Sequence, residues 1–317
     1  MKSIASAPGK VILFGEHFVV YGTKAILCSI DKRITASSQF INEKKAIVKT
    51  VLGNKEIRLD ELGNLDSISP KFLKPFFYIA YDVLRRNSHD KGIELILESE
   101  IPHGVGLGSS SAACVAATAS VNGLFKKLSK NEILKKSIEA EKTIFKHTSG
   151  ADSAVSVFGG FLTYDTTSGF QELSFKNNFD LIIANSAQIH NTQGIVNQVK
   201  KFKEKNENLF NELCAKEDEI IKNALHAFTE NNLEKMGMLM SENQKLLEQI
   251  GVSTEKIRTL INEATKTAYG SKLTGAGGGG CIISLVDKNN TESTLANLRK
   301  LADCFVAKVD YDGMIYM

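Results

Sequence analysis

The glycine- and serine-rich stretch at residues 101–112 is the part of this sequence best suited to holding an anion. It reads Ile-Pro-His-Gly-Val-Gly-Leu-Gly-Ser-Ser-Ser-Ala, with a glycine at every second position from 104 to 108. Glycine lets the backbone turn sharply and approach a ligand, and a helix that follows offers free N–H groups and the positive end of its dipole. The stretch predicts a phosphate-binding loop, although alone it also fits a turn with a helix cap.

A second glycine-rich stretch, at residues 272–281, reads Lys-Leu-Thr-Gly-Ala-Gly-Gly-Gly-Gly-Cys. It lies between a short strand and the apolar strand that begins near residue 280. Each glycine costs about 0.5–1 kcal/mol relative to alanine in regular structure, so such density needs a reason. The stretch indicates close approach by a ligand, with a tight hairpin as the alternative.

Charged side chains that could do chemistry occur at Lys10, Glu16, His17, Glu141 and Asp152. Each also has an ordinary interpretation. Lys10 fits a surface lysine paired with Glu16, and His17 fits a hydrogen-bonded polar residue. Asp152, at an expected helix start, fits a cap, and Glu141 fits an exposed helix residue.

Hydrophobic periodicity indicates the elements that must position these residues. Strands are expected at 26–38, 46–51, 93–97, 161–164, 181–184, 280–286, 305–309 and 314–317. Helices are expected near 72–83, 109–124, 129–145, 150–157 and 291–302, with a mainly helical region at 191–268. The fold class is therefore α+β in two parts.

Two features of the helical region have expected structural roles. The charge-rich section from Lys200 to Lys222 predicts solvated helix faces. The apolar seam of Leu233, Met236, Met240 and Leu247 predicts core, though it could also contribute to a homodimer.

Composition narrows the class of protein. The chain has 317 residues, 43% of them hydrophobic, and a net charge of +3, which is too mild to indicate nucleic acid or an anionic membrane as a partner. Its five cysteines are far apart and odd in number, which favours reduced, buried thiols in a cytoplasm over disulfides or zinc. The sequence gives no sign of a signal peptide or a membrane span.

Together, the three motifs at 7–17, 101–112 and 272–281 occur in the order expected of the GHMP kinase superfamily, which the chain resembles. Within it, residues 8–17, the Ser-Gly-Ala-Asp at 149–152 and the four-glycine loop look most like the mevalonate kinases. Asn243-Gln244, followed by Leu247 and Gly251-Val252, is also similar to that family.

The resemblance implies a two-domain GHMP kinase fold with the active site in the cleft between the domains, an N-terminal domain at 1–170 and a C-terminal domain at 171–317. It implies ATP- and Mg²⁺-dependent phosphorylation of the 5-hydroxyl of mevalonate, giving 5-phosphomevalonate and ADP for isoprenoid synthesis. The alternatives are another small-molecule kinase such as phosphomevalonate kinase, a nucleotide-binding regulator without catalysis, and a structural subunit acting through residues 200–250.

The resemblance also implies residue roles. Asp152 and Lys10 would be catalytic, and Ser110 and Glu141 would hold Mg²⁺. Glu139, two residues before Glu141, is the nearby carboxylate most easily mistaken for the ligand. The substrate would meet Lys10, Glu16, His17, Asp152 and Thr192. ATP would meet Pro102, His103, Gly104, Val105, Gly106, Leu107, Gly108, Ser109, Ser110, Ser111, Ala112 and Gly277. The chain departs from the usual family pattern at residues 145–148, Lys24 and Gln193, which affects the finer substrate contacts.

Overall fold

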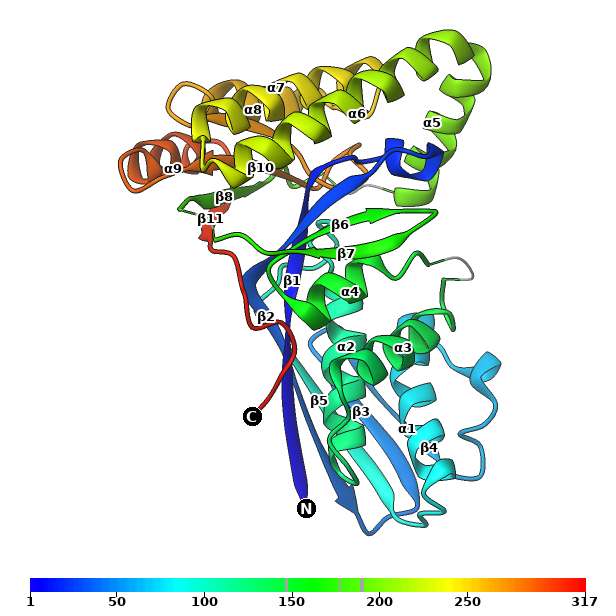
Figure 1. Ribbon diagram of the computed structural model, residues 1–317. Coiled ribbons are helices and arrows are strands. Elements are labelled where there is room, and N and C mark those ends of the chain that lie inside the picture. The colour runs from blue at the N-terminus through cyan, green and yellow to red at the C-terminus, as the bar shows by residue number, and fades with distance from the viewer. Residues whose placement is uncertain (146–147, 177, 189–190) are drawn as a thin grey trace.

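The computed structural model describes residues 1–145, 148–176, 178–188 and 191–317. Lys146 and His147, in the segment 145–148 that departs from the family pattern, therefore lie outside the described residues. The chain folds into two halves that meet at the ends of two long strands (Figure 1). The lower half in that view holds a large sheet with helices on one face. The upper half holds a smaller sheet beneath a layer of helices.

The larger sheet has eight strands. Six of them follow the order β12-β1-β2-β5-β3-β4, and β6 pairs with both β2 and β7. Its strands are β1 (Lys2–Phe14), β2 (Ala25–Ile41), β3 (Lys45–Thr50), β4 (Gly53–Arg58), β5 (Gly92–Ser99), β6 (Phe161–Asp165), β7 (Gly169–Leu173) and β12 (Ile315–Tyr316). The chain end therefore returns to the sheet in which the chain begins.

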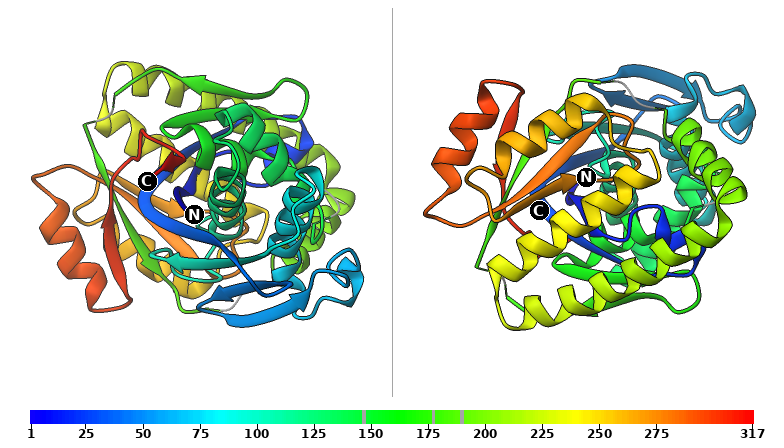
Figure 2. Two further views of the ribbon diagram at one scale, coloured as in Figure 1. Left: turned by 90° about the horizontal axis from the view of Figure 1, so that it is seen from below. Right: turned by 90° about the horizontal axis from the view of Figure 1, so that it is seen from above.

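Helices pack on one face of this sheet, and α2 lies nearest its centre (Figure 2). They are α1 (Lys74–Arg86), α2 (Ser109–Gly123), α3 (Lys130–Glu141) and α4 (Ala151–Phe158), with short 3₁₀ turns η1 (Phe18–Tyr21), η2 (Leu65–Ser67) and η3 (Lys71–Leu73). Every residue of α2 from Ser111 to Asn122 is buried. The small side chains in this helix allow the close approach to the sheet that its sequence predicts.

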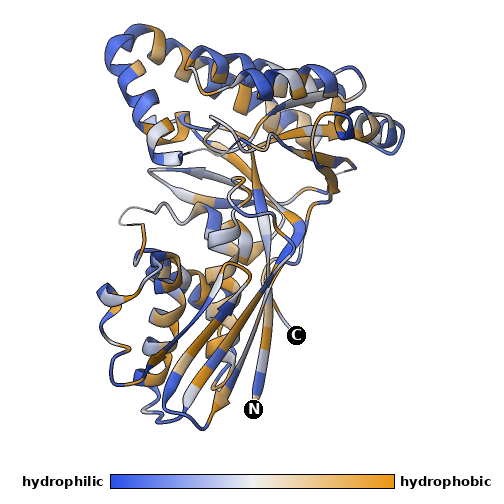
Figure 3. Ribbon diagram, turned by 180° about the vertical axis from the view of Figure 1, so that it is seen from behind, coloured by the Kyte–Doolittle hydropathy of each residue, from blue (hydrophilic) through white to orange (hydrophobic). Residues whose placement is uncertain are grey.

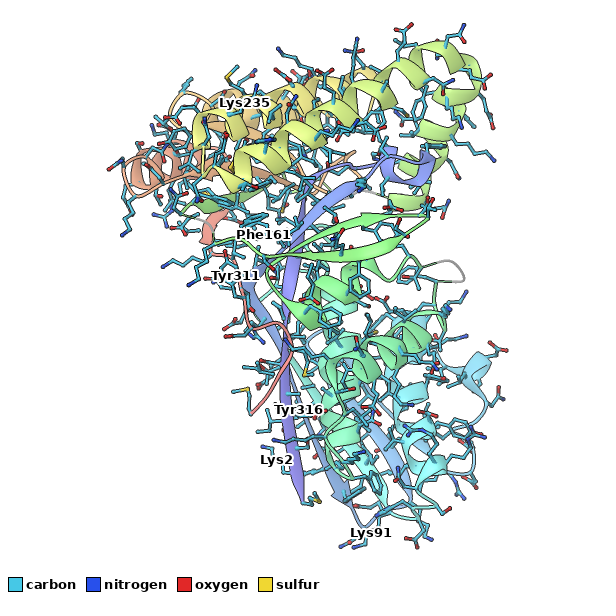
Figure 4. All side chains as sticks on the ribbon, viewed as in Figure 1. Lys2, Lys91, Phe161, Lys235, Tyr311 and Tyr316 are labelled. Carbon is cyan, nitrogen blue, oxygen red and sulfur yellow. The ribbon has the colours of Figure 1, made fainter. Side chains whose placement is uncertain are left out.

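The smaller sheet is antiparallel throughout and has the order β11-β8-β10-β9. Its strands are β8 (Asp180–Asn185), β9 (Gly270–Leu273), β10 (Cys281–Val286) and β11 (Cys304–Ala307). The helices of this half are α5 (Thr192–Lys205), α6 (Glu207–Thr229), α7 (Leu233–Gln249), α8 (Glu255–Ala264) and α9 (Thr291–Arg299). Hydrophilic residues colour the outer sides of α6 and α7, and Lys235 lies on that outer layer (Figures 3 and 4).

Aromatic rings fill the junction between the two halves. Phe228 of α6 lies 6.4 Å from Phe14 of β1 and 5.6 Å from Phe161 of β6, between ring centroids. Phe161 in turn lies 6.2 Å from Tyr311, and both are labelled at the waist of the molecule in Figure 4. Since large rings bury much apolar surface, this cluster stabilises the contact between the halves.

Most elements expected from the sequence are confirmed, with boundaries shifted by a few residues. The strand β1 was not singled out, because its first half contains Pro8 and Gly9, which usually interrupt strands. The structure accommodates them with a register shift between β1 and β2 at this point. Strands β9 and β10 pair on either side of residues 274–280, but this connection is longer than the tight hairpin that was the alternative for this stretch.

The seam on α7 is core, as its spacing predicts: Leu233, Met236, Met240 and Leu247 are all buried. The expectation of solvated faces between Lys200 and Lys222 is wrong at Glu217, which is fully buried. Three cysteines are buried as expected, whereas Cys214 and Cys304 are partly exposed. Among the described residues, no helix combines the length and apolarity needed to cross a membrane.

Helix α7 and strand β9 touch through a pair of glycines, and this contact generates a stability prediction. A methyl group on Gly237 would lie 2.1 Å from the carbonyl oxygen of Tyr269. We expect Gly237→Ala to lower the free energy of unfolding by about 1–3 kcal/mol, because backbone atoms must move apart. Denaturant unfolding measures this change.

Gly194 in α5 is the matched control, since a methyl group there would come no closer than 3.5 Å to its nearest neighbour. Gly194→Ala should retain or raise stability, as alanine favours helix. If Gly237→Ala were as stable as the parent, the tight α7–β9 contact would be contradicted.

Candidate active site

A cleft of about 650 Å³ opens where the two halves meet. Its lining comes from the end of β1, the loop before α2, the α3–α4 region, the start of α5 and the loop between β9 and β10. Both glycine-rich stretches therefore face one space. The lining residues singled out from the sequence are Lys10, Glu16, His17, Gly104, Gly106, Gly108, Ser109, Ser110, Ser111, Glu141, Asp152 and Thr192.

The loop at 104–108 is open toward this cleft. Gly104, Gly106 and Gly108 have φ angles of 72°, 85° and 73°, a region that favours glycine. Apart from its chain neighbours, no described atom lies within 4 Å of a methyl group built on Gly104. A methyl group built on Gly106 would have one such neighbour, the carbonyl oxygen of Thr274 at 3.8 Å. Gly108 is also the N-cap of α2, whose free N–H groups follow. The stretch is thus a helix cap and also suits an anion.

Lys10 and Asp152 form an ion pair inside the cleft. The Lys10 Nζ lies 3.1 Å from Asp152 Oδ2, and the lysine side chain is 5% exposed whereas that of the aspartate is 41% exposed. Gly108 makes room for this lysine, because a methyl group there would lie 2.7 Å from Lys10 Cγ. A buried cation beside a more open carboxylate suits catalysis at that carboxylate.

The ordinary interpretations of both residues are wrong. Lys10 is buried and pairs with Asp152, so it is not a surface lysine paired with Glu16. Asp152 lies in the first turn of α4, but the N-cap is Gly150, and that helix start has no side-chain cap.

Glu141 is buried at the end of α3 and is not an exposed helix residue. Its Oε1 accepts a hydrogen bond from Ser111, and its Oε2 accepts from Ser153 at 3.0 Å and Thr148 at 3.4 Å. Burial raises the pKa of this carboxyl, and the negative charge of the nearby Asp152 raises it further. The hydrogen bonds from Ser111, Ser153 and Thr148 lower this pKa and so partly oppose the change. A cation bound here would favour the ionised form.

These groups fit Mg²⁺, which prefers oxygen ligands and is usually held by one or two carboxylates together with substrate phosphates. No group of three or more His, Cys, Asp or Glu suited to a metal occurs within the described part of the chain. Mg²⁺ would therefore depend on Glu141, nearby hydroxyls and the nucleotide. Ser110 lines the cleft, but among the three serines at the start of α2 the one that donates to Glu141 is Ser111.

Glu16 and His17 occupy a strained turn just after β1. His17 has φ 62° and ψ −46°, and the N–H of Phe18 donates to the carbonyl of Glu16 at 2.7 Å, which closes a γ-turn. Such a conformation costs about 1–3 kcal/mol in a residue other than glycine. His17 Nε2 donates to the carbonyl of Ala276 at 2.8 Å, so the second glycine-rich loop contacts the turn directly.

Burial lowers the pKa of His17, and the neighbouring Lys272 charge lowers it as well, although the bond to Ala276 opposes the change. A neutral His17 that donates through Nε2 has Nδ1 as a hydrogen-bond acceptor. The turn therefore presents acceptor groups, which suit a substrate hydroxyl.

Lys272, Ser153 and Thr274 also belong to the site, although no pattern in the sequence singled them out. Lys272 is fully buried in β9 and forms an ion pair with Glu16. Thr274 Oγ1 accepts from the N–H of Ile12 at 2.9 Å and donates to the Ile12 carbonyl at 3.0 Å, which fixes the loop to β1. The one available signal was the position of Lys272 in a short strand beside an apolar one.

Of the remaining residues singled out from the sequence, some line the cleft and others are buried or pack elsewhere. Thr192 is the first residue of α5 and lines the cleft. Val105, Leu107 and Ala112 are buried, and Leu107 accepts a backbone hydrogen bond from Lys10 at 3.0 Å. Gly277 does not line the cleft in the described chain and packs on Val252, whose carbonyl oxygen would lie 2.4 Å from a methyl group there.

A second cavity, of about 140 Å³, adjoins the first and shares Ser109 and Ser110 with it. His103 contributes to its wall, whereas Pro102, partly buried in the same loop, lines neither cavity as described. The other walls are mostly apolar. They include Ile34, Val51, Leu52, Phe72, Phe76, Leu97 and Ala113.

Comparison with known proteins agrees with this arrangement. The GHMP kinases N terminal domain model matches residues 75–160, and the GHMP kinases C terminal model matches residues 224–303. The chain is 36% identical to the mevalonate kinase of Pyrococcus horikoshii, covering 92% of this chain and 91% of that protein. It is 33% identical to the mevalonate kinase of Methanocaldococcus jannaschii, covering 94% and 96%.

Solved structures give the same result. The crystal structure of the Methanococcus jannaschii mevalonate kinase has a TM-score of 0.87 at 29% identity, covering 97% of this chain and 98% of that one. A phosphomevalonate kinase from Streptococcus pneumoniae, solved with phosphomevalonate and AMPPNP, shares the fold at 17% identity and a TM-score of 0.76, covering 99% of each chain. Both domain models and the near-complete match to these relatives show that the chain belongs to the mevalonate kinase family of GHMP kinases.

Proposed function

We propose that this protein transfers the γ-phosphoryl group of ATP to the 5-hydroxyl of mevalonate, giving 5-phosphomevalonate and ADP in isoprenoid biosynthesis. The observation that supports this most directly is the Lys10–Asp152 pair, which lies in the cleft lined by Gly104, Gly106 and Gly108. The two relatives from Pyrococcus horikoshii and Methanocaldococcus jannaschii bear the name mevalonate kinase, and this chain matches each of them over nearly its whole length.

In the proposed reaction the mevalonate hydroxyl oxygen attacks the γ-phosphorus, the bond to the bridging oxygen breaks, and ADP leaves. Asp152 orients the hydroxyl and accepts its proton. Lys10 attracts the negative charge that develops on the attacking oxygen and on the transferring group. Mg²⁺, near Glu141 and Ser110, supplies charge neutralisation at the phosphate oxygens when bound.

The two cavities suggest how ATP is placed. The phosphates would lie against the residues from Gly104 to Ser111, with the α2 N–H groups pointing toward them. The apolar cavity shared through Ser109 and Ser110 would take the adenine, since apolar walls suit a flat aromatic base. Mevalonate would then lie at the other end, near Glu16, His17 and Thr192.

The charge of the cleft favours mevalonate over phosphomevalonate. Of the described lysines and arginines, Lys10 alone lines it. A substrate that already has a phosphate group needs more cations than a hydroxyacid. This supports mevalonate over the substrate of the more distant phosphomevalonate kinases.

Removing either member of the catalytic pair should affect turnover more than nucleotide binding. We expect Asp152→Asn and Lys10→Met each to lower kcat by at least ~100-fold, because positioned acid–base and electrostatic groups contribute such factors. Mevalonate-dependent ADP release measures kcat, and calorimetry measures ATP affinity, which should persist.

Lys45→Met is the matched control, because Lys45 pairs with Glu56 at 2.8 Å on the surface of the same sheet. Its kcat should equal that of the parent. A near-normal kcat in Asp152→Asn would be incompatible with the proposed role of that carboxylate.

The metal role of Glu141 has its own test. We expect Glu141→Gln to raise the Mg²⁺ concentration needed for half-maximal activity by about tenfold or more, since a neutral amide attracts the cation less than a carboxylate does. Glu139→Gln, two residues earlier on α3, should leave it unchanged. Equal Mg²⁺ requirements in the two variants would rule out Glu141 as a ligand.

We also propose domain limits, location and assembly. An N-terminal domain at 1–170 and a C-terminal domain at 171–317 agree with one sheet lying mainly in each, although β12 and residues 171–173 of β7 belong to the first sheet. The five free cysteines support a reducing, cytoplasmic environment.

A homodimer stays a prediction, and the buried α7 seam would not form its interface.

A further inference from the structure

A lysine that the proposed reaction does not use lies in the wall of the cleft. Lys272 in β9 is fully buried, and its ammonium donates to Glu16 Oε1 and to the carbonyl of Leu273, the latter at 2.6 Å. Burial lowers the pKa of this lysine, and the Glu16 carboxylate opposes that change. An ion in such a place is stable only with close partners, so its position is tied to that of Glu16.

A second buried carboxyl group, on the helical layer, lies close enough to Lys272 for their charges to interact. Glu217 on α6 is fully buried, and Asn243 on α7 donates to its Oε2 at 2.6 Å. Burial is the main cause that raises the pKa of Glu217 to about 7, the Glu16 charge adds to it, and Lys272 opposes it. One cation therefore serves two carboxyl groups from different elements.

The strained turn needs such fixed neighbours. A γ-turn at a histidine persists only where the surrounding structure determines it. Glu16 is fixed by Lys272, and His17 is fixed by the Ala276 carbonyl. Gly15 also packs tightly, because a methyl group there would lie 2.3 Å from the carbonyl oxygen of Lys24.

We propose that Lys272 is a positioning residue for the hydroxyacid end of the cleft: it acts through Glu16 to keep the Glu16–His17 turn in its substrate-binding shape. This inference rests on the proposed function for the identity of the substrate. Lys272 itself touches Glu16 and does not line the cleft in the described structure.

The test compares Lys272→Met with a double variant, Lys272→Met/Glu217→Gln. The single variant leaves two buried carboxyl groups without their cation and should lose stability. The double variant removes one of those carboxyl groups, so its melting temperature should recover toward that of the parent. Its KM for mevalonate should stay raised by about 10- to 100-fold, because the turn is no longer held, while its KM for ATP changes little.

A measurement without substrate accompanies the kinetics. Lys272 on β9 is the charged group that acts on His17. Glu16 on the same turn interacts with Lys272 and with Lys10 on β1, and Glu217 on α6 interacts with Glu16 and Lys272. Since the Lys272 charge lowers the pKa of His17, an NMR titration should show a higher His17 pKa in the double variant than in Glu217→Gln alone.

Arg33→Met is the control for a lost ion pair outside the cleft. Arg33 pairs with Asp310, and the two side chains are 17% and 8% exposed. This variant should lose stability with an unchanged KM for mevalonate and an unchanged His17 pKa.

The proposal is overturned if the double variant recovers both its melting temperature and its KM, or if KM for the two substrates rises equally. It is also overturned if neither Lys272 variant folds, since Lys272 would then serve folding alone. Absence of mevalonate turnover in the parent protein would instead reject the proposed function, and the His17 titration would still decide the role of Lys272.

Discussion

The geometry of the cleft depends on how the end of β1 is fixed to the second half of the molecule. Thr274 makes two hydrogen bonds with the backbone of Ile12, Lys272 pairs with Glu16, and Ala276 accepts from His17. All three partners come from β9 and the loop after it. Together with the aromatic cluster around Phe228, these contacts set the distance between the two glycine-rich stretches and therefore the width of the cleft.

The cleft shows an unequal distribution of charge that suits phosphoryl transfer. Lys10 and Asp152 pair at its centre, Glu141 is surrounded by serine and threonine hydroxyls, and the loop before α2 offers backbone N–H groups. Catalysis of this reaction consists mainly of positioning and charge stabilisation, so few side chains are required. Burial of Lys10 strengthens its effect, because a charge away from water is screened less.

Local patterns in the sequence predicted much of this arrangement. The loop at 101–112 and the helix at 109–124 follow from glycine content and periodicity, and the structure contains both. The family resemblance then indicated that Lys10 and Asp152 meet, and the structure pairs them. Their mutual contact was not derivable from spacing, since 142 positions separate Lys10 from Asp152.

What the sequence could not show depends on contacts between distant segments. Lysine is nearly always exposed, so nothing local marks Lys272 as buried, and Glu217 lies in a run of charges that otherwise suits a solvated face. The left-handed φ of His17 likewise depends on contacts with the distant residues Lys272 and Ala276, in addition to its neighbours in sequence. The missed strand β1 reflects the same limit, because Pro8 is tolerated only through a register shift with β2.

Mevalonate 5-kinase activity is tested most directly by ADP release from the purified chain with ATP and Mg²⁺, measured separately with mevalonate, phosphomevalonate, galactose and homoserine. We expect rapid turnover with mevalonate and a far lower kcat/KM with the other three. Turnover that requires phosphomevalonate, or none with mevalonate, would contradict it.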